Sequence, residues 1–166
     1  MLIKVRAVGI CGSDVECYAG RSIEGIFPYI PGHEWSGEVV DVGTATTTFK
    51  KGDRVVGETL EGCGICDNCK VGRQAALCRN PRVYGFQPAA PGAFAEYAMR
   101  KERNLLKLPS SLTYEEGALA EPFSVAYYGV WTVGGGVQPS DSLQDEPGYG
   151  ASVGDGRIRR NRDRRP

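Results

Sequence analysis

The chain has 166 residues, 41% of them apolar and 24% charged, and its 20 basic side chains balance 20 acidic ones. A neutral chain has no general attraction to nucleic acid or to an anionic membrane surface, so partners have to be inferred from local sites. No apolar run approaches the roughly 20 residues that cross a bilayer, and the first residues lack the layout of a signal peptide. We therefore expect a cytoplasmic protein with one compact domain and a tail.

Short β-rich segments dominate the first two thirds of the chain. The first, over residues 2–8, begins without a preceding turn, so we expect the chain to open inside a strand. Further strands are predicted over 37–43, 53–56, 94–99 and 105–108, with Gly- and Pro-containing turns between them. Short strands at close spacing indicate a barrel or a sandwich.

The first clear helix signal follows these strands. Thr113 and Glu116 have the spacing of a capping box, in which each side chain accepts a hydrogen bond from the other residue's backbone amide. A proline ring disfavours helical geometry at the residue before it, so Pro122 is expected to interrupt the helix at Glu121, and helix is expected to resume over 123–133.

The composition changes after Leu143. Residues 144–166 contain few apolar side chains among many Gly, Asp and Arg, and they cannot bury a core. We expect residues 134–143 to form a linker and residues 144–166 to be a disordered tail, whose abrupt onset is what translation in a shifted reading frame produces. Its arginines from Arg157 to Arg165 could form a nucleic-acid-binding arm, but acidic residues are mixed into the tail and no aromatic residue lies among these arginines.

Four of the six cysteines form the strongest local signal: Cys63, Cys66, Cys69 and Cys78. Four thiolates close a tetrahedral zinc shell with no open position, so this spacing predicts a structural zinc site. Two disulfides are the first alternative, and a reducing compartment argues against them. A nucleic-acid-binding zinc knuckle is the second, but it would need histidine, basic and aromatic residues between the ligands.

Two weaker elements precede this group. Cys11 follows the first predicted strand, and His33, the single histidine of the chain, follows a Pro-Gly pair. Taken alone, a cysteine is usually a small buried apolar residue, and a histidine is usually a hydrogen-bonded residue of the core. Neither element by itself predicts a site.

Taken in order, these elements resemble the zinc-containing medium-chain dehydrogenases over most of residues 2–143. Besides the four cysteines, the matching segments are Gly-Ile-Cys-Gly-Ser-Asp at 9–14, Gly-His-Glu at 32–34, Gly-Asp-Arg-Val at 52–55, Gly-Ala-Phe-Ala-Glu-Tyr at 92–97, Glu-Gly-Ala at 116–118 and Glu-Pro at 121–122. The Gly-His-Glu and Glu-Pro elements look most like sorbitol, threonine and related polyol dehydrogenases. The resemblance implies a mainly β fold with short helices, a GroES-like, partly open barrel over residues 1–133 with a zinc lobe.

The same resemblance implies a catalytic zinc held by Cys11 and His33, with Glu34 or Glu121 and a water or substrate oxygen completing the shell. Adjacent residues of a strand point to opposite faces. His33 and Glu34 can therefore both reach one metal only if the backbone turns at this point. Gly32 permits such a turn. Glu121 is expected to be either a ligand or a nearby carboxylate that exchanges with water.

The proton path and two departures from the family pattern complete the predicted site. Ser13 is expected to accept the proton of the substrate hydroxyl, the alternative being a serine that caps a turn. Many relatives have histidine where this chain has Glu16, which either replaces that relay or faces water. Eight residues separate Cys69 from Cys78, one more than is usual, and the extra residue is expected to bulge outward.

The implied function is zinc-dependent oxidation of a secondary alcohol or polyol with NAD or NADP, using two zinc ions per chain. No apolar strand and glycine fingerprint of a Rossmann domain follow Leu143, and from the start inside a strand we expect the family's opening hairpin to be lost as well. We therefore assign no cofactor-binding residues and expect the chain alone to have no catalytic activity. Relatives are often homo-oligomers. The main alternative is a non-catalytic zinc-binding structural or interaction module, and nucleic-acid binding through the lobe and the tail ranks last.

Overall fold

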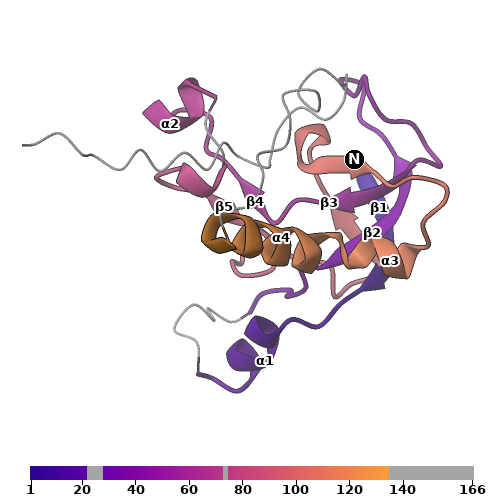
Figure 1. Ribbon diagram of the computed structural model, residues 1–166. Helices are drawn as coiled ribbons and strands as arrows, with labels where there is room; N and C mark the ends of the chain where they lie inside the picture. The colour runs from indigo at the N-terminus through magenta and orange to yellow at the C-terminus, as the bar shows by residue number, and fades with distance from the viewer. Residues whose placement is uncertain (22–27, 73–74, 135–166) are drawn as a thin grey trace, which may run out of the picture. The chain divides into compact units, whose positions relative to one another are not determined.

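The computed structural model describes residues 1–21, 28–72 and 75–134 (Figure 1). The chain divides into two compact units, Met1–Val125 and Ala126–Pro166, and the second is described only over its first residues, to 134. The predicted linker beyond residue 134 and the predicted tail over 144–166 lie outside the described residues. The sheets and both candidate sites belong to the first unit.

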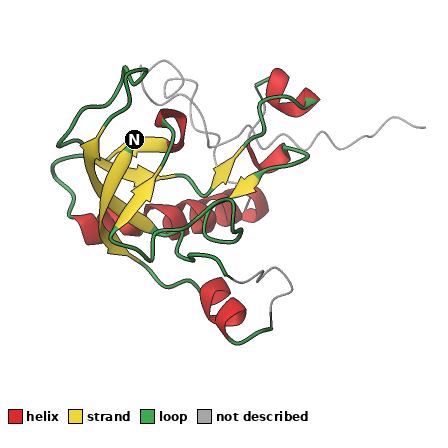
Figure 2. Ribbon diagram, turned by 180° about the vertical axis from the view of Figure 1, so that it is seen from behind, coloured by secondary structure: helices red, strands yellow, loops and turns green. Residues whose placement is uncertain are grey.

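A five-stranded antiparallel sheet forms the centre of the first unit (Figure 2). In spatial order its strands are β6 (Tyr97–Met99), β1 (Leu2–Val8), β2 (Trp35–Asp41), β3 (Arg54–Gly57) and β7 (Leu105–Lys107). The prediction for β1 is confirmed, and β2 begins two residues earlier than the expected 37. The expected strand over 94–99 was too long, because the amide of Phe94 bonds to the carbonyl of Pro31 and not to the sheet.

The core is built on the central strands of the sheet, β1, β2 and β3. Ile3 of β1 and Val39 of β2 are paired across the strands, and both are fully buried together with Val55 of β3. Full burial of a Val or Ile side chain contributes about 1.5–3 kcal/mol, so this group is a main source of stability for the sheet. Trp35 and Phe49 extend the same apolar cluster.

A second, two-stranded ladder forms a stalk that we define as β4 (Leu60–Glu61) paired with β5 (Arg82–Val83). Between these strands the chain makes the short helix α2 (Asp67–Lys70) and the 3-10 turn η1 (Ala75–Leu77). The stalk therefore brings together the two ends of the segment that carries the four clustered cysteines. We refer to residues 62–81 as the lobe.

Four further helical segments complete the described chain: α1 (Gly12–Tyr18), η2 (Glu102–Asn104), α3 (Tyr114–Ala118) and α4 (Ala120–Gly134). The predicted capping box is present at α3, where Thr113 Oγ1 accepts from the amide of Glu116 at 3.1 Å and Glu116 Oε2 accepts from the amide of Thr113 at 2.7 Å. Helix α3 packs on β1 and β2, and Ser36 Oγ donates to the carbonyl of Tyr114 at 2.5 Å. This contact covers the second face of the central strand.

The predicted interruption at Glu121–Pro122 was misplaced. The break between α3 and α4 falls at Leu119, and Pro122 is the third residue of α4. The first amides of a helix have no partner within the helix, so a proline there removes no hydrogen bond. Glu121 consequently lies in the first turn of a continuous helix.

These observations confirm a mainly β fold with short helices. All strand pairs among the described residues are antiparallel, whereas a dinucleotide-binding Rossmann domain is built on a parallel sheet. No helix within the described ranges is both long enough and apolar enough to span a membrane.

Candidate metal centres

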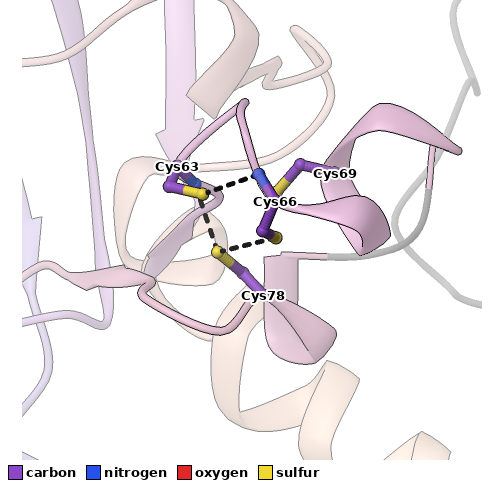
Figure 3. A group of neighbouring side chains, drawn as sticks. All are labelled: Cys63, Cys66, Cys69 and Cys78. Atoms are coloured by element: carbon purple, nitrogen blue, oxygen red, sulfur yellow. Dashed lines mark hydrogen bonds between the residues drawn. The ribbon is translucent and has the colours of Figure 1, made fainter.

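The four cysteines of the lobe converge on one point (Figure 3). Their sulfur atoms all lie within 4.8 Å of one another, and all six cysteines of the chain are free thiols. Cys63 follows the stalk strand β4, Cys66 is the N-cap of α2, Cys69 lies within α2, and Cys78 follows η1. The eight-residue spacing before Cys78 does not keep its sulfur out of the group.

Backbone amides surround these sulfur atoms. The amide of Cys63 donates to Cys78 Sγ at 3.2 Å, and the amide of Cys66 donates to Cys63 Sγ at 3.4 Å. Hydrogen bonds from backbone amides lower the pKa of the Cys63 thiol and lower that of Cys66 to about 6. At Cys69 the amide of Gly64 lowers the pKa, but burial and the neighbouring sulfurs outweigh it and raise the value to about 11. Closely spaced thiols hinder one another's ionisation, and a divalent cation removes that repulsion, so the donor set fits zinc.

A second group of ligand atoms is formed by Cys11, His33 and Glu34, which also lie within 4.8 Å of one another. Gly32 has a φ of +92°, and the backbone bends at Glu34 before β2 begins at Trp35, so His33 and Glu34 are not in extended strand geometry and can face the same point. A Cβ at Gly32 would lie 2.9 Å from the amide nitrogen of Phe94, so glycine is required by space as well as by conformation.

His33 is 4% exposed, and its Nδ1 atom is buried with no hydrogen-bond partner among the described residues. A buried polar atom without a partner is costly, and metal coordination is one way to satisfy it. A thiol, an imidazole and a carboxylate are the ligands that zinc uses in catalytic sites, where three protein groups leave one position open. The second group therefore also fits zinc.

Asp14 is a site residue that the sequence reasoning did not single out. Its buried carboxylate accepts from the amide of Cys11 at 3.0 Å and from the amide of Gly32 at 3.4 Å, and one of its oxygens lies 3.8 Å from His33 Nδ1. One side chain thus ties together the two segments that carry the ligands. The Cys-x-x-Asp spacing of a helix N-terminus was the available local signal, since Asp14 is the third residue of α1.

Two more contacts shape this group. The amide of Gly9 donates to the carbonyl of Glu34 at 2.7 Å, and a Cβ at Gly9 would come within 2.4 Å of Glu34 Oε2. The ring of Phe86 lies 4.8 Å from that of His33, between centroids. Phe86 belongs to the segment that leaves the lobe, so the two candidate centres are not independent parts of the fold.

The other predicted residues lie as follows. Ser13 stands two residues after Cys11, and its Oγ is buried with no hydrogen-bond partner among the described residues. Glu121 is not one of the three converging residues, but it interacts electrostatically with His33 and Glu34, and burial raises its pKa. Glu16 is exposed and its carboxylate pairs with Arg21, with Nε and Oε2 2.6 Å apart. Glu16 therefore faces solvent, as the second of its two sequence interpretations expected.

Comparison with known proteins gives the family. Residues 1–110 match the alcohol dehydrogenase GroES-like domain, and the chain belongs to this family. Sorbitol dehydrogenase of Bacillus subtilis (strain 168) is 44% identical over 131 residues, which cover 77% of this chain and 36% of that protein. L-threonine 3-dehydrogenase of Idiomarina loihiensis is 41% identical over 133 residues, which cover 77% of this chain and 38% of that protein.

Solved structures agree with this assignment. A Sinorhizobium meliloti 1021 protein, described as a zinc-binding dehydrogenase and bound to NADP, superimposes with a TM-score of 0.70 at 36% identity. The match covers 78% of this chain and 37% of that protein. The chain thus spans well under half the length of the relatives that it matches, and those relatives are alcohol and polyol dehydrogenases.

Proposed function

We propose that this chain is the zinc-binding catalytic part of an NAD(P)-dependent dehydrogenase that acts on a secondary alcohol or polyol. The observation that carries the proposal is the convergence of the ligand atoms of Cys11, His33 and Glu34 within 4.8 Å of one another. Two of these residues directly follow the left-handed Gly32. The names of the related proteins, a sorbitol and a threonine dehydrogenase, support the substrate class.

Cys11 and His33 would hold the catalytic zinc, with Glu34 as the third protein ligand. Glu121 is the nearby carboxylate, and it interacts electrostatically with His33 and Glu34. When bound, zinc acts as a Lewis acid toward the hydroxyl oxygen of the substrate, and the nicotinamide cofactor is the oxidant. The half-buried Glu121, whose pKa is raised by burial, is suited to hold a proton beside the site.

Ser13 would take up the proton of the substrate hydroxyl. Its Oγ has no hydrogen-bond partner among the described residues and stands two positions from Cys11, at the start of α1. A hydroxyl both accepts and donates, so it can receive a proton on one side and release one on the other. A serine engaged in capping a turn would have its Oγ occupied.

The lobe would hold the other zinc, with Cys63, Cys66, Cys69 and Cys78 as its ligands. Four sulfur ligands leave no position for substrate, so this zinc is structural. Thiolate ligands need a reducing compartment, which favours the cytoplasm, and we propose neither a membrane nor a nucleic-acid partner.

Metal analysis of the purified chain tests the ligand assignment. We expect two zinc ions per chain, one in Cys11→Ser and one in Cys63→Ser. With Co²⁺ in place of zinc, we expect sorbitol or threonine to change the visible absorption of the site that contains Cys11. The absorption of the lobe should stay unchanged. We call the group of Cys11, His33 and Glu34 the second site. If this site holds no metal in the wild type, or if neither sorbitol nor threonine changes its cobalt spectrum, the support for catalysis is lost.

We also propose that the chain alone does not turn over, because none of the described residues builds a parallel, dinucleotide-binding sheet. NAD-dependent oxidation of sorbitol or threonine by the purified chain would contradict this. A non-catalytic zinc module is the second candidate function, favoured by the lobe offering four ligands while the other group offers three. One zinc per chain, lost in Cys63→Ser, would support the module.

A further inference from the structure

A short piece of chain connects the two candidate metal centres. Phe86, whose ring lies 4.8 Å from that of His33, follows Cys78 of the lobe by eight positions in the sequence. The connecting residues pass through the stalk strand β5 and then through Tyr84. The contacts that fix the position of Tyr84 therefore help to position both Cys78 of the lobe and Phe86 beside His33.

Tyr84 is held on three sides. Its side chain is buried, with the residue 6% exposed, and its hydroxyl donates to Glu61 Oε2 at 2.5 Å. Its amide donates to the carbonyl of Thr59 at 2.8 Å. The guanidinium of Arg100, which is 2% exposed, lies 4.0 Å from the centre of the Tyr84 ring and 5.3 Å from that of Trp35.

Glu61 gives the Tyr84 hydroxyl a fixed partner at the base of the lobe. It is the last residue of β4, two positions before Cys63, and its side chain is 3% exposed. Besides Tyr84, its carboxylate accepts from Lys101 at 2.5 Å and from Arg103 at 2.6 Å. A buried carboxylate with three donors has little freedom to move, so the stalk is anchored to the five-stranded unit beside β7.

The residues after Tyr84 bear directly on the histidine loop. Gly85 has a φ of +86°, and a Cβ there would lie 3.0 Å from the carbonyl oxygen of Gly32. The amide of Gly85 donates to the carbonyl of Ala90 at 2.8 Å, and the amide of Ala93 donates to the carbonyl of Gly32 at 2.8 Å. A displacement of residues 84–86 must therefore displace Gly32 and the imidazole that follows it.

Without a ligand we expect the lobe itself to be poorly ordered between the ends that the stalk holds. Its helix α2 has four residues and its 3-10 turn η1 has three, which are too short to be stable alone. Metal binding commonly supplies the folding free energy of such a segment. The order of residues 78–86 is then expected to depend on occupation of the four-cysteine site.

We propose that Tyr84 is a positioning residue through which metal bound at the four-cysteine site sets the geometry of the Cys11, His33 and Glu34 site and raises its affinity for metal. The inference rests on the proposed function, because it requires both groups to bind a metal. Coupling of this kind is reciprocal, so metal at the second site strengthens binding at the first by the same factor.

Cobalt titration of the whole chain tests the coupling. The four-thiolate site gives the stronger thiolate-to-cobalt charge-transfer absorption, so the two sites can be followed separately. Tyr84→Phe keeps the ring beside Arg100 and removes the hydroxyl. We expect Tyr84→Phe, with the lobe loaded, to bind Co²⁺ at the second site about 5-fold more weakly, within the roughly 2- to 30-fold range of coupling residues that touch neither ligand.

The matched control is Tyr114→Phe, which also removes a tyrosine hydroxyl that donates to a glutamate, in this case Glu38 at 3.5 Å on the other side of the sheet. It is expected to leave both cobalt affinities unchanged. A purely structural role of Tyr84 would lower the melting temperature and leave the affinity unchanged in fully folded protein. Equal second-site affinities in Tyr84→Phe and Tyr114→Phe would overturn the inference.

Hydrogen exchange of the wild type tests the same point without a variant. We expect the first equivalent of Zn²⁺, which fills the lobe, to slow exchange at the amides of Gly85 and Ala93 as well as within residues 62–81. Protection confined to the lobe would overturn the inference. A wild-type cobalt titration that lacks the four-thiolate absorption would instead overturn the proposed metal sites, and the inference with them.

Discussion

Replacement of Glu61 by glutamine should reveal how much the buried carboxylate contributes to stability. Its three hydrogen bonds, from Lys101, Tyr84 and Arg103, outweigh the effect of burial and lower its pKa from 4.5 to about 2. At about 1.4 kcal/mol per pKa unit this shift corresponds to about 3 kcal/mol. Lys101 and Arg103 are themselves more than half exposed, and screening by water reduces the expected value to about 2 kcal/mol.

The pH dependence follows from the direction of the shift. The pKa is lower in the folded chain, so the stabilisation is complete above the unfolded value of 4.5 and is lost as the pH falls from there toward about 2. Urea unfolding of Glu61→Gln and wild type should therefore differ by about 2 kcal/mol at pH 7 and by much less at pH 3. Both proteins are measured with a chelator present, so that metal release at low pH does not contribute to the difference between them.

Glu102→Gln is the control for this measurement, because Glu102 lies between Lys101 and Arg103 in the sequence but accepts from the exposed amides of Thr47 and Thr48. At neutral pH, Glu102→Gln should lower the free energy of unfolding by less than Glu61→Gln does. A Glu61→Gln penalty below about 0.5 kcal/mol at pH 7, or one that is equal at pH 7 and pH 3, would refute the reasoning, since a surface ion pair is already worth up to about 1 kcal/mol.

Three further outcomes are expected. Asp14→Asn should weaken metal binding at the second site about 10- to 100-fold in a chelator competition and leave the lobe metal in place, because Asp14 holds the amides of Cys11 and Gly32. Gly32→Ala should abolish second-site metal binding, whereas Gly52→Ala, at a similar φ of +88° but with nothing within 4 Å, should only lower the melting temperature; equal metal content in the two would contradict the role of the turn. Ile3→Ala should destabilise the chain to urea by about 2–5 kcal/mol without changing metal content below the transition.

Features set by neighbouring residues could be predicted from the sequence. The capping box at Thr113 and Glu116 and the first strand depend on contacts a few residues apart, and the four lobe cysteines lie within sixteen positions. The break at Leu119 was misplaced because the rule for proline applies inside a helix and not in its first turn. The sequence pattern did not say where α4 begins.

Contacts between distant parts of the chain could not be predicted in this way. Tyr84 and Glu61 are 23 positions apart and Lys101 is 40 positions from Glu61, so no local pattern marks their hydrogen bonds. The role of Asp14 likewise depends on Gly32, which lies 18 positions away. The resemblance to a family supplied Cys11 and His33, with Glu34 or Glu121 to complete the shell, and the structure brings Glu34 to the other two at a bend that follows the left-handed Gly32.

The stalk of β4 and β5 has a consequence for how the lobe can vary. Its two strands clamp the chain where it enters and where it leaves, so the sheet does not depend on the number of residues between them. Loop-closure entropy grows slowly, by about 0.6 kcal/mol for each doubling of loop length, and one added residue between Cys69 and Cys78 changes it very little. The length of the segment 62–81 can therefore vary with little effect on the stability of the sheet, provided that its four cysteine sulfur atoms still converge.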